Sequence, residues 1–89
     1  MRYDFSLVLK AVRDKFLLTQ GELSAIVHIS VGAITELERA KRKPSIASRK
    51  KINYFLVDND YSLEMLVEDY KSIFEKDSNE QNNTHGSKS

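Results

Sequence analysis

Residues 19–44, TQGELSAIVHISVGAITELERAKRKP, carry the strongest structural signals of the chain. Thr19 is followed three residues later by Glu22, the capping-box spacing in which a hydroxyl and a carboxylate each accept a backbone N–H at a helix start. Two short apolar-periodic segments follow, separated by the three residues that begin at His28, and Ser30 is placed to cap the second segment. The stretch therefore predicts two short helices joined by a tight turn.

Positive charge is concentrated at the end of this stretch and directly after it. Residues 39–51 contain seven basic side chains and no Asp or Glu: Arg39, Lys41, Arg42, Lys43, Arg49, Lys50 and Lys51. Residues 1–51 carry eleven Lys or Arg against five Asp or Glu, whereas residues 52–89 carry three against eight, so the net charge of +1 conceals two halves of opposite sign. A basic segment without carboxylates favours phosphate binding over an ordinary solvated surface.

The composition limits the classes of protein to consider. A chain of 89 residues forms at most one domain with a modest core, so oligomerisation is expected. It contains no cysteine and no long apolar segment, which predicts a soluble, cytoplasmic protein without disulfides. His28 has no second histidine nearby, and no acid–base pair or phosphate-binding glycine loop is present, so we expect neither a metal site, nor a cofactor, nor an enzyme.

Apolar periodicity extends the helical pattern to both sides. Phe5, Leu9, Val12 and Phe16 predict a first helix over about residues 4–17, with Asp4 as its cap. After Pro44, which cannot continue a helix backwards, Ser45 is placed to cap a fourth helix. Residues 58–60 predict a turn. Because no strand pattern is present, the sequence predicts an all-α fold.

The last apolar pattern predicts a single helix over residues 62–76, about 22 Å long. Its first half is expected to close the core, and its second half to mediate dimerisation; the dimer residues would be Leu66, Tyr70, Ile73 and Phe74. The alternative is that these side chains fold back on the first helix. Residues 77–89 contain no apolar side chain and are predicted to be disordered. The organisation is thus a domain over residues 1–60, an amphipathic helix over 61–76 and a tail.

Over about residues 5–66 the chain resembles the Cro and phage-repressor (XRE-type) helix-turn-helix family. The matching positions are Arg13, Thr19-Gln20, Glu22-Leu23, Ile34, Leu37-Glu38 and Pro44-Ser45. The resemblance implies a five-helix repressor-like DNA-binding domain, in which the helix after Ser30 enters the major groove. It also implies an internal ion pair between Arg13 and Glu38 that joins the first helix to the third.

The same resemblance implies roles in DNA binding. Gln20 would contact a phosphate and brace the recognition helix, although an ordinary exposed glutamine is the alternative. The side chains facing bases would be Ser30, Val31, Gly32, Thr35 and Glu36. The side chains on the sugar-phosphate backbone would be Arg39, Lys41, Arg42 and Lys43.

Several positions depart from the family pattern, among them Arg49 and Lys50, which stand where the family commonly has leucine in the fourth helix. His28 and Ala40 stand where the family has glycine, so the turn at His28 is expected to relax its left-handed geometry or to shift. Gly32 lies inside the recognition helix, where it lowers helix propensity and removes a reading side chain, which makes readout of DNA shape plausible.

The resulting hypothesis is a sequence-specific transcriptional regulator, expected to repress, that binds a roughly palindromic operator in double-stranded DNA as a homodimer. One alternative is the antitoxin of a toxin–antitoxin pair, with a protein partner on the acidic C-terminal helix. Another is a protein-interaction module or anti-repressor that keeps the fold without binding DNA.

Overall fold

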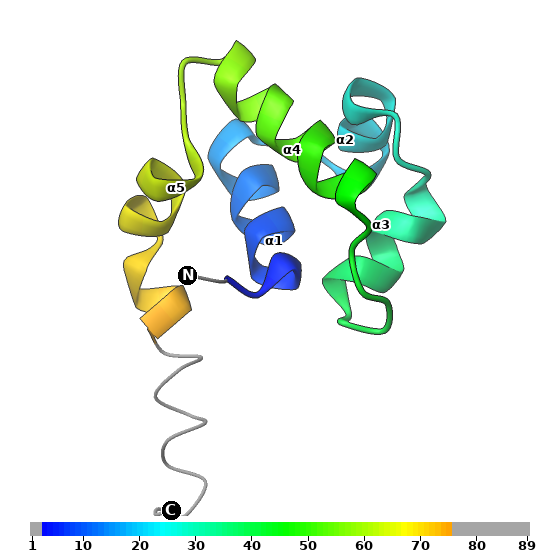
Figure 1. Ribbon diagram of the computed structural model, residues 1–89, viewed down its shortest axis with the longest axis horizontal. Helices are drawn as coiled ribbons and strands as arrows, with labels where there is room; N and C mark the ends of the chain where they lie inside the picture. Colours follow the sequence, from blue (N-terminus) through cyan, green and yellow to red (C-terminus); the bar gives the residue numbers. More distant parts are fainter. Residues whose placement is uncertain (1–2, 76–89) are drawn as a thin grey trace, which may run out of the picture.

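The computed structural model describes residues 3–75, which form five named helices and one further helical segment (Figure 1). The helices are α1 Phe5–Phe16, α2 Gln20–Val27, α3 Val31–Glu38, α4 Ile46–Asp58 and α5 Leu63–Asp69. Residues 71–75 are also helical, and no strand occurs within residues 3–75. The predicted all-α fold is confirmed.

Short polar side chains begin each helix. Asp4 Oδ1 accepts the backbone N–H of Ser6 at 3.0 Å, and Ser30 and Ser45 cap α3 and α4 in the same way. Thr19 and Glu22 form both hydrogen bonds of the predicted capping box, at 3.0 and 2.9 Å. These contacts satisfy backbone donors that the first turn of a helix leaves unpaired, so the helix starts are set locally by the sequence.

The core is built around α1, which lies between α5 on one side and α3 on the other (Figure 1). The helix α2 packs against α3 and α4. The largest fully buried side chains come from all five helices: Leu9, Val12, Leu23, Ile34, Leu56 and Leu66. Burial of such side chains stabilises the fold by about 1.5 to 3 kcal/mol each, and it fixes α3 by its inner face only.

The C-terminal region differs from the predicted single helix. The helix α5 ends at Asp69, because Tyr70 leaves helical geometry with φ −114° and ψ 33°, and a second helical segment follows. The Tyr70 hydroxyl donates to Asp14 Oδ2 of α1 at 2.6 Å, and this bond, together with desolvation, raises the pKa of Tyr70 to about 12. The bend turns the segment towards α1.

The apolar residues of this region serve the protomer's own core. Leu66 has no exposed surface, so its predicted place at a dimer surface is wrong. Phe74 stacks edge-on against Tyr3, with ring centroids 5.9 Å apart. Tyr70 therefore contacts α1, as in the alternative where this region folds back on the first helix, and Phe74 contacts the segment before α1, while Ile73 stays 43% exposed. The predicted disordered tail, residues 77–89, lies outside the described residues.

The turns on both sides of α3 contain left-handed residues that are not glycine. His28 has φ 60° and Ala40 has φ 59°, a region that costs an ordinary L-residue roughly 1–2 kcal/mol. The turn at His28 therefore keeps the left-handed geometry that we expected it to relax. Lys51 of α4 donates to the His28 carbonyl at 2.8 Å, which holds this turn in place. Both turns thus orient α3 despite the absence of glycine.

Candidate nucleic-acid interface

The outer face of α3 is open to solvent. Ser30, Gly32 and Glu36 are exposed, and the Val31 side chain keeps 45% of its surface accessible. The inner face carries the buried side chains Ile34, Leu37 and Glu38. A helix that is anchored on one side and free on the other can enter a groove of DNA without disturbing the core.

A buried carboxylate anchors the inner face. Glu38 is 6% exposed and forms a two-pronged ion pair with Arg13 of α1, with Nε to Oε2 at 2.7 Å and Nη2 to Oε1 at 2.9 Å. This fork geometry is the strong form of an Arg–carboxylate contact. It joins the helices α1 and α3 across 25 residues of sequence.

Gln20 extends this contact to a third helix. Its amide nitrogen donates to Glu38 Oε1 at 3.0 Å, while its amide oxygen accepts the Thr35 hydroxyl at 2.9 Å. We call Arg13, Glu38, Gln20 and Thr35 the inner network. Gln20 is the first residue of α2, so the inner network fixes α2 against α3.

Titration of Glu38 follows from this environment. Burial is the largest single influence and raises its pKa, but hydrogen bonds from Arg13 and Gln20, with the positive charges of Arg13 and Lys10, act the other way. The net result is a pKa below the ordinary value of 4.5. The hydrogen bond to Glu38 in turn raises the pKa of Arg13 against the opposing effect of desolvation. Glu38 is therefore ionised at neutral pH.

The inner network bears on two of the residues proposed to face DNA. The Thr35 hydroxyl donates its hydrogen bond to Gln20. The Thr35 side chain is half-buried, unlike its neighbours on the outer face. The Gln20 amide, also half-buried, is engaged on both of its ends within the protein. The structure thus gives both residues a positioning contact, and a phosphate contact by Gln20 stays a prediction.

The basic loop follows α3 directly. Arg39, Lys41, Arg42 and Lys43 are all exposed, and the Lys41 backbone N–H donates to the Glu36 carbonyl at 2.8 Å, which ties the start of the loop to the helix end. The outer face and the basic loop therefore form one continuous surface. Sequence reasoning missed a contact on this surface: Arg42 Nη2 lies 2.7 Å from Glu36 Oε1. The sequence did carry a signal for this contact, because Glu36 and Arg42 have opposite charges and lie on the two sides of the turn at Ala40.

The comparisons with known proteins agree with this geometry. A protein-family pattern described as helix-turn-helix matches residues 9–52, which span α2, α3 and most of α1, together with the basic loop. Residues 9–52 are accordingly a helix-turn-helix domain of the Cro and phage-repressor (XRE) type, and the predicted resemblance is confirmed. Domains of this family bind DNA and are typically not enzymes. Comparison with curated proteins and with solved structures found no match.

Two structural surveys complete the description of residues 3–75. None of their helices combines the length and the apolar character that crossing a bilayer requires. Within the same residues, no group of three or more His, Asp or Glu side chains is placed to hold a metal ion.

Proposed function

We propose that the protein is a sequence-specific transcriptional regulator that represses by placing α3 in the major groove of its operator. The observation that carries this proposal is the continuous surface on which the open face of α3 meets four exposed cations: Arg39, Lys41, Arg42 and Lys43. Cations beside a recognition helix neutralise phosphates and position the helix, while the helix reads the bases.

The chemistry of the outer face limits which bases it reads. Val31 offers an apolar surface to a thymine methyl group, and Glu36 accepts a hydrogen bond from cytosine N4. Gly32 has no side chain, and a Cβ added there would meet nothing within 4 Å, so the backbone of α3 can approach the groove floor closely. With few hydrogen-bonding groups, part of the specificity would come from DNA shape.

A salt titration with random-sequence duplex tests the DNA-binding part of the proposal. The logarithm of affinity is expected to fall linearly with the logarithm of salt concentration, and Lys41→Ala together with Lys43→Ala should reduce the slope by about two. Lys71→Ala, an exposed lysine outside the basic loop, is the matched control and should leave the slope unchanged. Association that ignores salt, or a salt slope that the double substitution leaves unchanged, contradicts the proposal.

We also propose that the protein acts as a homodimer on a roughly palindromic site. Two recognition helices must lie about 34 Å apart to enter successive major grooves on one side of a duplex. Ile73 is the exposed apolar residue of the predicted dimer set. We expect Ile73→Asp to dissociate the dimer in sedimentation experiments, whereas Ile46→Asp, at a 74% exposed position on α4, should not. Equal sedimentation of both variants and the parent protein contradicts this interface.

A protein partner is the second candidate, as in an antitoxin or an interaction module. Ile26 of α2 and Tyr54 of α4 keep 47% and 59% of their surface exposed, and they line one shallow cavity of about 180 Å³. This apolar surface supports a protein contact separate from the DNA face. An intact fold without salt-dependent DNA binding would favour this candidate.

A further inference from the structure

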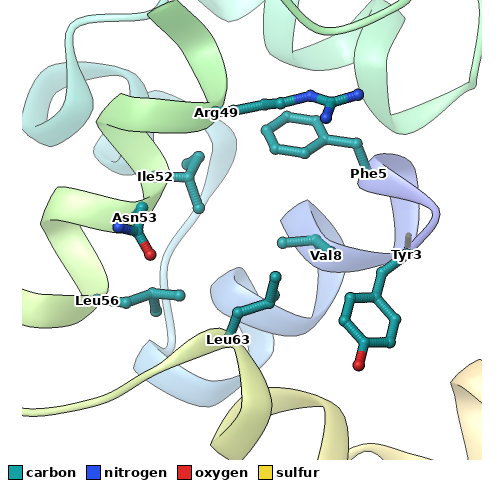
Figure 2. Close-up of a pocket in the computed structure, with 8 residues that line it drawn as sticks. All are labelled: Tyr3, Phe5, Val8, Arg49, Ile52, Asn53, Leu56 and Leu63. Carbon is teal, nitrogen blue, oxygen red and sulfur yellow. The ribbon is translucent and has the colours of Figure 1, made fainter. Parts of the chain in front are cut away.

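A cavity of about 320 Å³ lies between α1, α4 and the start of α5 (Figure 2). Its apolar lining comes from all three helices: Phe5, Val8, Ile52, Leu56 and Leu63. The cavity opens to solvent on the side of the exposed residues Arg49 and Asn53. Its volume lies at the lower end of the range for small-molecule sites, roughly 300–1,000 Å³.

Three polar side chains complete the lining. Tyr3 lies in the segment before α1, with its hydroxyl pointing away from the other lining residues (Figure 2), and Arg49 and Asn53 extend from successive turns of α4. Figure 2 shows the Arg49 guanidinium beside the Phe5 ring. The Arg49 side chain is charged and exposed, and it takes part in none of the ion pairs formed among residues 3–75. The cavity thus combines an apolar interior with a cation at its edge.

We propose that this cavity binds a small apolar carboxylate, with the hydrocarbon part between α1 and α4 and the carboxylate on Arg49. A guanidinium matches a carboxylate with two parallel hydrogen bonds. An apolar chain gains from leaving water for the dry part of the cavity. This proposal is independent of DNA binding, because none of the atoms involved belongs to α3.

The position of the cavity connects it to the DNA-binding surface. Phe5 also lines a second cavity, of about 400 Å³, whose other walls include Leu37 of α3 and the loop residues Lys41 and Lys43. A ligand in the first cavity would contact Phe5, whose side chain also borders the basic loop. Phe5 therefore borders both cavities.

Calorimetric titration of the full chain with octanoate, 1-octanol and octylamine tests the proposal. These probes share one hydrocarbon chain and differ in the charge of the head group. We expect saturable one-to-one binding of octanoate in the submillimolar range, at least tenfold weaker binding of octanol, and weaker binding still of octylamine. Octanoate should also raise the melting temperature, because a ligand of the folded state stabilises it. Equal affinity for the three probes, or a lowered melting temperature, overturns the proposal.

Two variants locate the site. Arg49→Gln should remove the preference for octanoate over octanol while leaving octanol binding intact, and Lys50→Gln, the same charge change one residue further on, should keep the tenfold preference. Asn53→Phe places a ring at an exposed lining position of α4 and should weaken both probes more than tenfold. Undiminished octanoate binding in Arg49→Gln overturns the proposal, as does a parent protein that binds no octanoate.

Discussion

The two faces of α3 use the same kind of ion pair in opposite environments. Glu38 on the inner face and Glu36 on the outer face lie two residues apart, and each has a guanidinium nitrogen at 2.7 Å. The Glu38 side chain is 6% exposed, whereas the Glu36 and Arg42 side chains are 50% and 51% exposed. The shortest distances are equal, so the two pairs differ in burial and in the second Arg13 contact and the Gln20 bond that Glu38 also has.

The comparison shows that the length of an ion pair does not measure its contribution to stability. Solvent screens an exposed pair, which contributes about 0–1 kcal/mol. Removal of one partner of a buried pair leaves a charge without compensation, and this costs far more. The inner pair, Arg13–Glu38, therefore holds the fold together, and the outer pair, Arg42–Glu36, sets the charge of the DNA-binding surface.

Arg13→Met is expected to have the largest effect, because it leaves the Glu38 carboxylate buried with only Gln20 as a partner. We expect the free energy of unfolding to fall by about 2–4 kcal/mol, at or below the usual range for a buried pair since the Arg13 side chain is 28% exposed. Denaturant titration followed by circular dichroism measures this change. Lys41→Ala is the control, with an expected change within about 0.5 kcal/mol. Equal losses in the two variants would refute the assignment of the inner pair.

The stability of the protein at low pH tests the inner pair through the titration of Glu38. The folded-state pKa of Glu38 lies below 4.5, so its contribution is complete above the unfolded-state pKa and is lost as the pH falls through the folded-state value. Unfolding titrations at a series of pH values below 5 should therefore show a decline in stability that is shallower in Glu38→Gln. A decline as steep in Glu38→Gln as in the parent protein would contradict the assignment of the inner pair.

The sequence was sufficient for features that depend on neighbouring residues. The caps of α1 to α4 depend on side chains within three residues of the helix start, and all of them are present as predicted. The Arg13–Glu38 contact spans 25 residues, and apolar periodicity carries no information about it. It was predicted only through the family resemblance, which describes contacts between helices.

The end of α5 shows where periodic patterns fail. The apolar spacing continues through Tyr70, and nothing local marks a helix end there. The hydroxyl of Tyr70 bonds to Asp14, a residue 56 positions away, and the chain bends so that this contact and the Phe74–Tyr3 contact form. A periodic pattern shows which side of a helix is buried but not which partner buries it. Packing on the protein's own core and packing in a dimer therefore predict the same apolar spacing in this segment.

Gly32→Ala tests whether the outer face of α3 has any packing role. A Cβ at this position meets nothing within 4 Å, so the substitution should increase the free energy of unfolding by about 1 kcal/mol through helix propensity alone. Thermal and denaturant unfolding both measure this gain. Ala33→Gly, at a half-buried position on the same helix, is the converse variant and should lose at least as much. Destabilisation by Gly32→Ala would mean that the outer face is packed rather than open.

Glu36→Gln is expected to have the smallest effect on stability, within about 0.5 kcal/mol, because its ion pair is exposed. Its effect on DNA binding should be clear, since the substitution removes a negative charge from the DNA-binding surface and frees Arg42 to contact a phosphate. Affinity for random duplex should rise roughly fivefold, and the salt slope should steepen by about one. Glu64→Gln, an exposed carboxylate at the start of α5, makes the same change in net charge. If it raises affinity equally, net charge alone is responsible; if only Glu36→Gln does so, the outer pair restrains binding to random sequence.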